Sequence, residues 1–193
     1  MATDPFIHHL GLCESESVGS GTRVWAFAHV LPGAVVGKDC NICDGAFIES
    51  GVVIGNRVTV KNGVMIFAGA RVGDDVFLGP GVVFTNDLYP RSRYREGIDH
   101  LRGIEVKRGA TIGANATIVC GYQIGEFSFV GAGAVVASDV PAYALMLGNP
   151  ARQTGWVCRC GHRLDDRYTC LNCGNAYRLE GEALTNKDAG EPS

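Results

Sequence analysis

Residues 106–136, VKRGATIGANATIVCGYQIGEFSFVGAGAVV, carry a branched aliphatic residue at every sixth position. These residues are Val106, Ile112, Ile118, Ile124, Val130 and Val136. An amphipathic helix would repeat its apolar residues every three or four positions, and a half-buried strand would alternate them. A strict period of six fits neither element over this length, so the stretch predicts short strands separated by turns.

The same period continues on the amino-terminal side of an interruption, and the complete series has eighteen apolar positions. The upstream members are Val18, Val24, Val30, Val36, Ile42, Ile48, Ile54, Val60, Ile66, Val72, Leu78 and Phe84. Glycine is frequent one and three residues after the aliphatic residue, and a small or β-branched residue stands four after it. We predict that three units form one triangular coil with its aliphatic side chains inside, which gives an all-β parallel helix of about six coils over residues 18–141.

Units such as IGANAT (112–117) and VGAGAV (130–135) resemble the left-handed parallel β-helix of the hexapeptide-repeat acyltransferases. The left hand is implied by this resemblance alone, because crossover connections are usually right-handed. Residues 81–92, GVVFTNDLYPRS, and residues 109–156 are similar to N-acetyltransferases that modify nucleotide-linked 3-amino sugars. The resemblance runs from about residue 7 to residue 157. It implies an acetyl-CoA-dependent enzyme, and the nearest subgroup acts on UDP-2-acetamido-3-amino-2,3-dideoxyglucuronate in O-antigen-like glycan biosynthesis. The alternative subgroup acts on dTDP-3-amino-6-deoxyhexoses.

The expected organisation has five parts. Residues 1–17 form a lead-in, 18–141 the β-helix with an inserted loop at 90–105, and 142–157 a connecting segment. Residues 158–180 form a zinc-ribbon-like module, and 181–193 a disordered tail.

The inserted loop and its flank supply the predicted substrate site. The resemblance assigns Asn86 to the sugar amine, because a neutral amide carbonyl can accept a hydrogen bond from the amine and position it. Asp87 is expected to orient Asn86 or to act electrostatically. Asn86 has a structural alternative, a corner residue chosen for its tolerance of unusual backbone angles. The substrate-binding candidates are Arg91, Arg93 and Tyr94 on the loop and Lys61 on the coil; the basic loop suits phosphate groups, and its alternative is a solvated surface loop.

Small residues one coil apart supply the predicted acetyl-CoA site. Ala114 and Ala132 are separated by eighteen residues and follow Gly113 and Gly131, so they stack on one face. In the resembled family the pantetheine arm lies along such a face, and the resemblance places Arg152 near the adenine and phosphates. The alternative is that these small residues only satisfy packing. No residue stands out as a general base among His8, His9, His29, His100 and His162, and His29 is expected to be structural or to contact another subunit.

Four of the eight cysteines gather after Trp156, as Cys158, Cys160, Cys170 and Cys173. Two cysteine pairs flanking a hairpin-like stretch suit a structural tetrahedral zinc site, with His162 as an alternative ligand to Cys158. Loose thiols on a mobile tail are the competing interpretation. The other cysteines, at positions 13, 40, 43 and 120, are expected to be small buried or half-buried residues.

Composition and resemblance also limit which partners and which cellular compartment are expected. A net charge of −3 gives no reason to expect nucleic acid or an anionic membrane as a partner. Neither a secretory signal nor a membrane-spanning run is apparent, so a cytoplasmic enzyme is expected. The resemblance implies a homotrimer with sites between subunits. The other classes considered are a non-catalytic solenoid scaffold and a γ-type carbonic anhydrase, which would need several histidines at metal-binding spacing.

Overall fold

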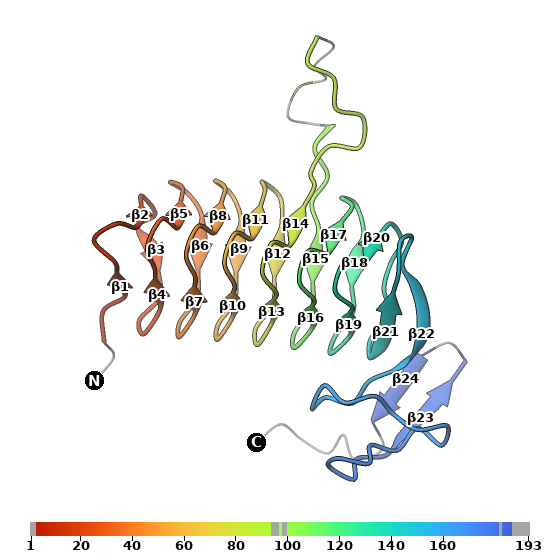
Figure 1. The fold of residues 1–193 in the computed structure, drawn as a ribbon. Helices are drawn as coiled ribbons and strands as arrows, with labels where there is room; N and C mark the ends of the chain where they lie inside the picture. Colours follow the sequence, from red (N-terminus) through yellow and green to blue (C-terminus); the bar gives the residue numbers. More distant parts are fainter. Residues whose placement is uncertain (1–2, 94–96, 98–99, 182, 187–193) are drawn as a thin grey trace.

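The computed structural model describes residues 3–93, 97, 100–181 and 183–186, and there the chain winds as a long solenoid (Figure 1). Each turn adds one short strand to each of three parallel sheets, and strands three positions apart in the chain pair with each other. This arrangement confirms the predicted all-β parallel β-helix.

The strands of the three sheets have the following bounds. The first sheet contains β1 (Phe6–Ile7), β4 (Arg23–Val24), β7 (Asn41–Ile42), β10 (Thr59–Val60), β13 (Phe77–Leu78), β16 (Thr111–Ile112), β19 (Phe129–Val130), β21 (Ala144–Leu147) and β22 (Arg152–Trp156). The second contains β2 (Leu12–Cys13), β5 (His29–Val30), β8 (Phe47–Ile48), β11 (Met65–Ile66), β14 (Val83–Phe84), β17 (Thr117–Ile118) and β20 (Val135–Val136). The third contains β3 (Ser17–Val18), β6 (Val35–Val36), β9 (Val53–Ile54), β12 (Arg71–Val72), β15 (Glu105–Val106) and β18 (Gln123–Ile124).

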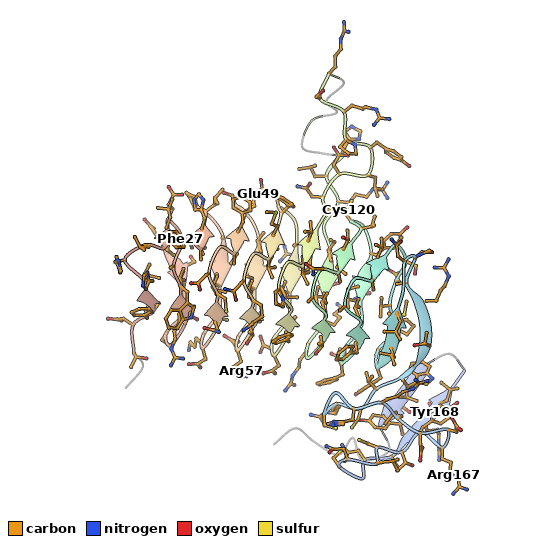
Figure 2. The ribbon with its side chains drawn as sticks, viewed as in Figure 1. Phe27, Glu49, Arg57, Cys120, Arg167 and Tyr168 are labelled. Carbon is orange, nitrogen blue, oxygen red and sulfur yellow. The ribbon has the colours of Figure 1, made fainter. Side chains whose placement is uncertain are left out.

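The turns between sheets form three corners that run the length of the solenoid. The first corner, after strands of the first sheet, includes residues 43–46, 61–64, 79–82, 113–116 and 131–134. The second corner, after strands of the second sheet, includes residues 49–52, 67–70, 119–122 and the inserted loop. The third corner includes residues 37–40, 55–58, 73–76, 107–110 and 125–128. Figure 2 shows Glu49 of the second corner on the edge from which the loop rises, and Arg57 of the third corner on the opposite edge.

The six-residue period follows from the way each unit is packed. From β4 to β20 the second residue of every strand is buried, and in all units except those of Leu88 and Tyr122 the residue four positions later is buried beside it, as for Val24 and Ala28. The residue three after the aliphatic has a positive φ, which glycine adopts at Gly33 and asparagine at Asn115. Directly after the aliphatic the chains approach closely. A Cβ on Gly79 would lie 2.6 Å from the nitrogen of Ala114 one turn above.

The solenoid extends beyond both predicted ends. The prediction of a lead-in over residues 1–17 is wrong, because β1 and β2 already form the first turn and Ile7 pairs with Val24. The period hides this turn, since Cys13 and Val18 are five residues apart instead of six. The segment 142–157 is also more than a connection. β21 pairs in parallel with β19 as a further rung of the first sheet, and β22 returns antiparallel to β21.

The inserted loop and the carboxy-terminal module project from this frame in Figure 1. The loop leaves after β14 and returns at β15, one residue earlier than the predicted boundary of 105. The module ends in the hairpin β23 (Tyr177–Glu180) and β24 (Ala183–Asn186). The prediction of disorder from residue 181 is therefore wrong for residues 183–186, while residues 182 and 187–193 lie outside the described part of the chain. Among the described residues, no helix is long and apolar enough to cross a membrane.

Candidate active site

The residues predicted for acetyl-CoA stack on the first corner as expected. β16 and β19 are paired, with Ile112 opposite Val130, so Ala114 lies directly below Ala132. Ala132 is exposed and Ala114 is half-buried. A Cβ on Gly113 would lie 2.5 Å from the nitrogen of Ala132, which explains why this position has no side chain.

Among the described residues, two backbone N–H groups of this column have no acceptor, whereas side chains accept the N–H at two equivalent positions of the third corner. On the third corner, the N–H of Lys38 donates to the side chain of Asn56 at 2.9 Å, and the N–H of Asn56 donates to Asp74 at 2.8 Å. Within the described part of the chain, no acceptor takes the equivalent N–H of Ala114 or Ala132. Two stacked N–H groups beside small side chains are suited to bind carbonyl groups of an extended ligand.

Arg152 lies at the upper end of the same column. It opens β22 and pairs with Leu147 of β21, and the Leu147 side chain occupies the space above Gly131. The Arg152 side chain is exposed, and its Nη1 donates to the carbonyl of Ala151 at 2.8 Å. The structure therefore brings Gly113, Ala114, Gly131, Ala132 and Arg152 to one corner.

Asn86 lies elsewhere, at the foot of the loop on the second corner. Its carbonyl accepts the N–H of Arg102 at 2.9 Å, so the two stems of the loop are tied together at this point. The preceding Thr85 accepts the N–H of Cys120 through its hydroxyl at 2.9 Å, and Figure 2 shows Cys120 beneath the loop. Asn86 is half-buried and is not among the residues with positive φ. The alternative explanation of Asn86 as a residue tolerated for its backbone angles is thus not supported.

Thr85 was missed by the sequence interpretation. Its contact with Cys120 spans thirty-five residues of sequence, which no local pattern reveals. The only available signal was its position beside Asn86.

The remaining loop candidates are exposed. The Asp87 carboxylate accepts the N–H of Tyr89 at 2.8 Å, which shapes a turn directly after Asn86. Arg91 is exposed and its Nη1 donates to the Pro90 carbonyl, and Arg93 is exposed as well. Tyr94 lies outside the described residues.

Lys61 is not brought to Asn86 within one chain, because it lies on the first corner. It is close enough to Cys43 to act on that thiol: burial raises the pKa of Cys43, and the positive charge of Lys61 opposes the shift. A surface pocket of about 460 Å³ lies at this level of the solenoid. Its lining residues are Arg23, Trp25, Asn41, Cys43, Asp44 and Asn62. Lys61 and the alanine column therefore share a corner, and the second sheet separates them from Asn86.

His29 has a structural environment near the amino-terminal end. Its Nε2 lies 2.8 Å from a carboxylate oxygen of Glu14, and its ring packs edge-on against Phe47 at 5.8 Å between centroids. It belongs to β5, three turns from β14 along the second sheet. These contacts agree with the structural role expected for His29.

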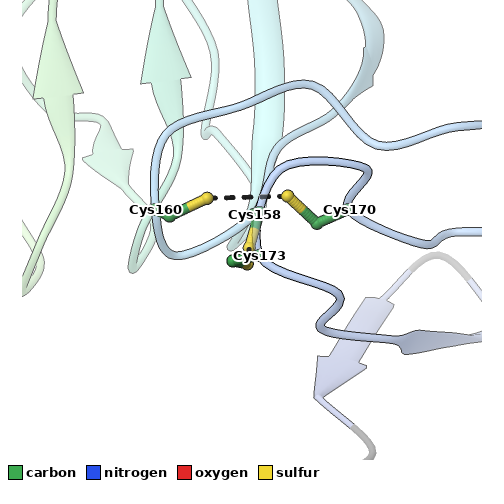
Figure 3. A group of neighbouring side chains, drawn as sticks. All are labelled: Cys158, Cys160, Cys170 and Cys173. Atoms are coloured by element: carbon green, nitrogen blue, oxygen red, sulfur yellow. Dashed lines mark hydrogen bonds between the residues drawn. The ribbon is translucent and has the colours of Figure 1, made fainter.

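The four cysteines of the carboxy-terminal module converge, and their sulfur atoms all lie within 4.8 Å of one another (Figure 3). Among the described residues, they form the only group of three or more His, Cys, Asp or Glu side chains placed to hold a metal. Cys40, Cys43 and Cys120 are buried and Cys13 is half-buried, as the sequence predicts.

Comparisons with known proteins agree with this geometry. Residues 17–50 match the family described as "Bacterial transferase hexapeptide (six repeats)", and residues 103–138 match "Hexapeptide repeat of succinyl-transferase". A dTDP-3-amino-3,6-dideoxy-alpha-D-galactopyranose 3-N-acetyltransferase of Aneurinibacillus thermoaerophilus is 52% identical over 175 residues, which cover 90% of each chain. The bifunctional protein GlmU of Streptococcus gordonii is 43% identical over 137 residues, which are 71% of this chain and 28% of GlmU.

A solved structure extends the likeness to three dimensions. A hexapeptide-repeat acetyltransferase from Vibrio cholerae, solved with acetyl coenzyme A, superposes with a TM-score of 0.56 at 26% identity. The superposition covers 65% of this chain and 72% of the other. An N-acyltransferase from Bacillus cereus, solved with dTDP and coenzyme A, superposes with a TM-score of 0.57 over 82% and 86% of the two chains. At 15% identity it shows the shared fold alone.

Proposed function

Because this chain belongs to the hexapeptide-repeat N-acetyltransferases of nucleotide-linked amino sugars, we propose that its own substrate is a dTDP-linked 3-amino-3,6-dideoxyhexose. The observation that carries this choice is the 52% identity to the dTDP-sugar enzyme over 90% of both chains. The sequence alone favoured a UDP-linked 3-amino uronate, whereas this relative supports the dTDP-linked sugar. The product would serve glycan biosynthesis.

The proposed reaction is acyl transfer from sulfur to nitrogen. The neutral 3-amino group attacks the thioester carbonyl of acetyl-CoA, the carbon–sulfur bond breaks, and an amide forms. The departing thiolate takes up the proton that the amine loses. The side-chain carbonyl of Asn86 accepts a hydrogen bond from the amine and so aims its lone pair at the thioester. Asp87 holds the following turn through its bond to Tyr89.

Acetyl-CoA is placed along the first corner. The amide carbonyl oxygens of its pantetheine arm would accept hydrogen bonds from the N–H groups of Ala114 and Ala132, which have no acceptor within the described residues. The outer face of the column can accept an extended arm, because Ala132 is exposed and the side chains of Ala114 and Ala132 are small. Arg152 stands at the end of the column, where an exposed guanidinium suits the phosphates.

The proposed site is completed by a second copy of the chain. In one chain Asn86 and the alanine column lie on different corners, with the second sheet between them. A homotrimer in which the second corner of one subunit faces the first corner of the next would bring them together. Arg91 and Arg93 of the loop and Lys61 of the neighbouring subunit would then surround the nucleotide sugar, while the fourth predicted contact, Tyr94, lies outside the described residues.

The UDP-linked uronate remains the second candidate, because exposed loop arginines such as Arg91 and Arg93 suit a sugar carboxylate as well as a phosphate.

A thiol-release assay with acetyl-CoA separates the two substrates. The panel would contain dTDP-3-amino-3,6-dideoxygalactose, dTDP-3-amino-3,6-dideoxyglucose and the UDP-linked 3-amino uronate at equal concentrations. We expect the highest kcat/KM with a dTDP sugar, and mass spectrometry should show one added acetyl group. A higher kcat/KM with the UDP uronate would reverse the assignment, and turnover with none of the three would remove the substrate class.

A further inference from the structure

The carboxy-terminal module, residues 157–186, has no role in the proposed acetyl transfer, yet it contains the closest cluster of reactive side chains in the described chain. The sulfur atoms of Cys158 and Cys173 are 3.4 Å apart, and those of Cys160 and Cys170 are 3.5 Å apart. A disulfide would need about 2.05 Å. Four sulfurs around a zinc ion with bonds of about 2.3 Å would be separated by about 3.8 Å. The observed spacing is thus that of a metal site and not of two disulfides.

Both cysteine pairs lie on turns that end at a glycine, with the first turn one residue shorter than the second. After Cys160 the chain turns at Gly161, whose φ is 86° and whose N–H donates to the Cys158 carbonyl at 2.8 Å. After Cys173 it turns at Gly174, with a φ of 80° and an N–H donated to the Cys170 carbonyl at 2.8 Å. A Cβ on either glycine would meet nothing within 4 Å, so the backbone angle and not crowding requires glycine. Each turn points two sulfur atoms at the other pair (Figure 3).

The side chains around the cluster lie within hydrogen-bond distance of the sulfur atoms and do not serve as further metal ligands. The hydroxyl of Tyr177, which is 1% exposed, lies 3.2 Å from the Cys158 sulfur and accepts the N–H of Arg159 at 2.9 Å. His162 has its Nδ1 3.6 Å from the Cys160 sulfur, so it stands beside a ligand and does not replace Cys158. Hydrogen-bonded partners around the ligands are a regular feature of structural metal sites.

We propose that Cys158, Cys160, Cys170 and Cys173 bind one structural Zn²⁺ as a closed tetrathiolate centre. Four soft thiolates in a tetrahedral arrangement select zinc over hard cations, and no open position is left for catalysis.

The metal stabilises the fold of the module, which lies beside the last turns of the solenoid. The buried cluster of the module consists of Cys158, Leu164, Cys170, Tyr177 and Leu184, and two of these five are ligands. So small an apolar core needs a metal to fold.

The module packs on the third corner through a row of aromatic side chains. Tyr177 contacts Tyr143 at 5.3 Å between ring centroids, and Tyr143 stacks on Phe127 at 5.5 Å. Arg159 lies 5.1 Å above the Phe127 ring. The zinc centre therefore fixes the surface of the module that packs on the third corner at the last turns of the solenoid.

The test uses the full-length protein purified under reducing conditions, with metal content measured by elemental analysis and native mass spectrometry. We expect one zinc per chain in the wild type. Cys160→Ser and Cys173→Ser replace exposed ligands and should each reduce zinc to below about a tenth per chain. Cys13→Ser, a half-buried cysteine outside the module, is the matched control and should keep the full zinc content. Cobalt replacement in the wild type should give the visible bands of tetrahedral thiolate coordination.

The two ligand variants will lose order in the module, so the solenoid is followed separately by circular dichroism, where we expect the β-sheet signal to remain. Thiol titration of the native wild type should show four cysteines that become reactive only when a chelator is added, while Cys40, Cys43 and Cys120 stay buried in the solenoid. Full zinc content in both ligand variants would overturn the proposal. So would a wild-type protein, supplied with zinc under reducing conditions, that binds none or forms disulfides among these four cysteines.

Discussion

Asn86 is held in place by its main chain, which makes its side chain a clean target. The hydrogen bond that ties it to Arg102 uses the backbone carbonyl, and alanine retains that group. We predict that Asn86→Ala lowers kcat/KM for the amino sugar by about 100-fold, because the amine loses the acceptor that aims it. Steady-state kinetics measures the loss, while the melting temperature and molar mass should not change.

The variant Asp87→Asn tests whether the charge of the neighbouring residue contributes to the reaction. Its side-chain oxygen can still accept the N–H of Tyr89, so the turn is retained and a smaller loss is expected. An Asn86→Ala enzyme with near wild-type kinetics would remove Asn86 from the site, and a larger loss in Asp87→Asn would make the charge more important than the amide.

A substitution at Ala132 tests whether the first corner binds acetyl-CoA. Its side chain is exposed, so a larger side chain is tolerated by the fold but projects over the column. We predict that Ala132→Trp lowers kcat/KM for acetyl-CoA by about 100-fold, equivalent to about 2.7 kcal/mol of lost binding. Glu126→Trp is the control, because Glu126 is exposed at the same position of a third-corner unit. Equal losses in both variants would show that this column does not bind acetyl-CoA.

The loop is a second element that can be removed without opening the solenoid. Its stems already meet at Asn86 and Arg102, and the strands on either side, β14 and β15, pair with β17 and β18. We predict that replacing residues 89–100 by two glycines, which retains Leu88 against the core, leaves the melting temperature within a few degrees of the wild type. The KM for the nucleotide sugar should rise at least about tenfold as loop arginines are lost. Unchanged KM values would show that the loop is a solvated surface segment that does not bind the nucleotide sugar.

The elements show what the sequence could and could not predict. The period of six located every strand from β4 to β20, because each unit buries its own aliphatic residue and needs no distant partner. The first turn was hidden by the five-residue step between Cys13 and Val18. β21 and β24 were missed because they form by pairing with β19 and β23, and pairing leaves no local period.

At the scale of the molecule, the corner on which each candidate lies matters more than its type. Residue spacing alone placed Ala114 below Ala132, because eighteen residues make one turn. The same spacing also separates Lys61 from Asn86, because Val60 and Phe84 are 24 residues apart, which is not a whole number of turns. The assignment of strands to sheets agrees, since one residue follows a strand of the first sheet and the other a strand of the second. Under the proposed assignment of site residues, a single chain presents two half-sites that face different directions.

Two half-sites per chain predict complementation between inactive subunits. Asn86→Ala damages the second corner and Ala132→Trp damages the first, so each homotrimer should be inactive. Co-expression with two different tags gives mixed trimers. If one chain supplies Asn86 and the next supplies the alanine column, every trimer that contains both variants has one of its three sites with both halves intact. Purification on both tags removes the homotrimers, so we expect the doubly purified mixture to recover up to about a third of wild-type activity. Chains carrying Asn86→Ala under both tags provide the control and should recover none. Activity no higher than the sum of the two homotrimers would place the whole site within one chain, and the proposed arrangement of subunits would then be wrong.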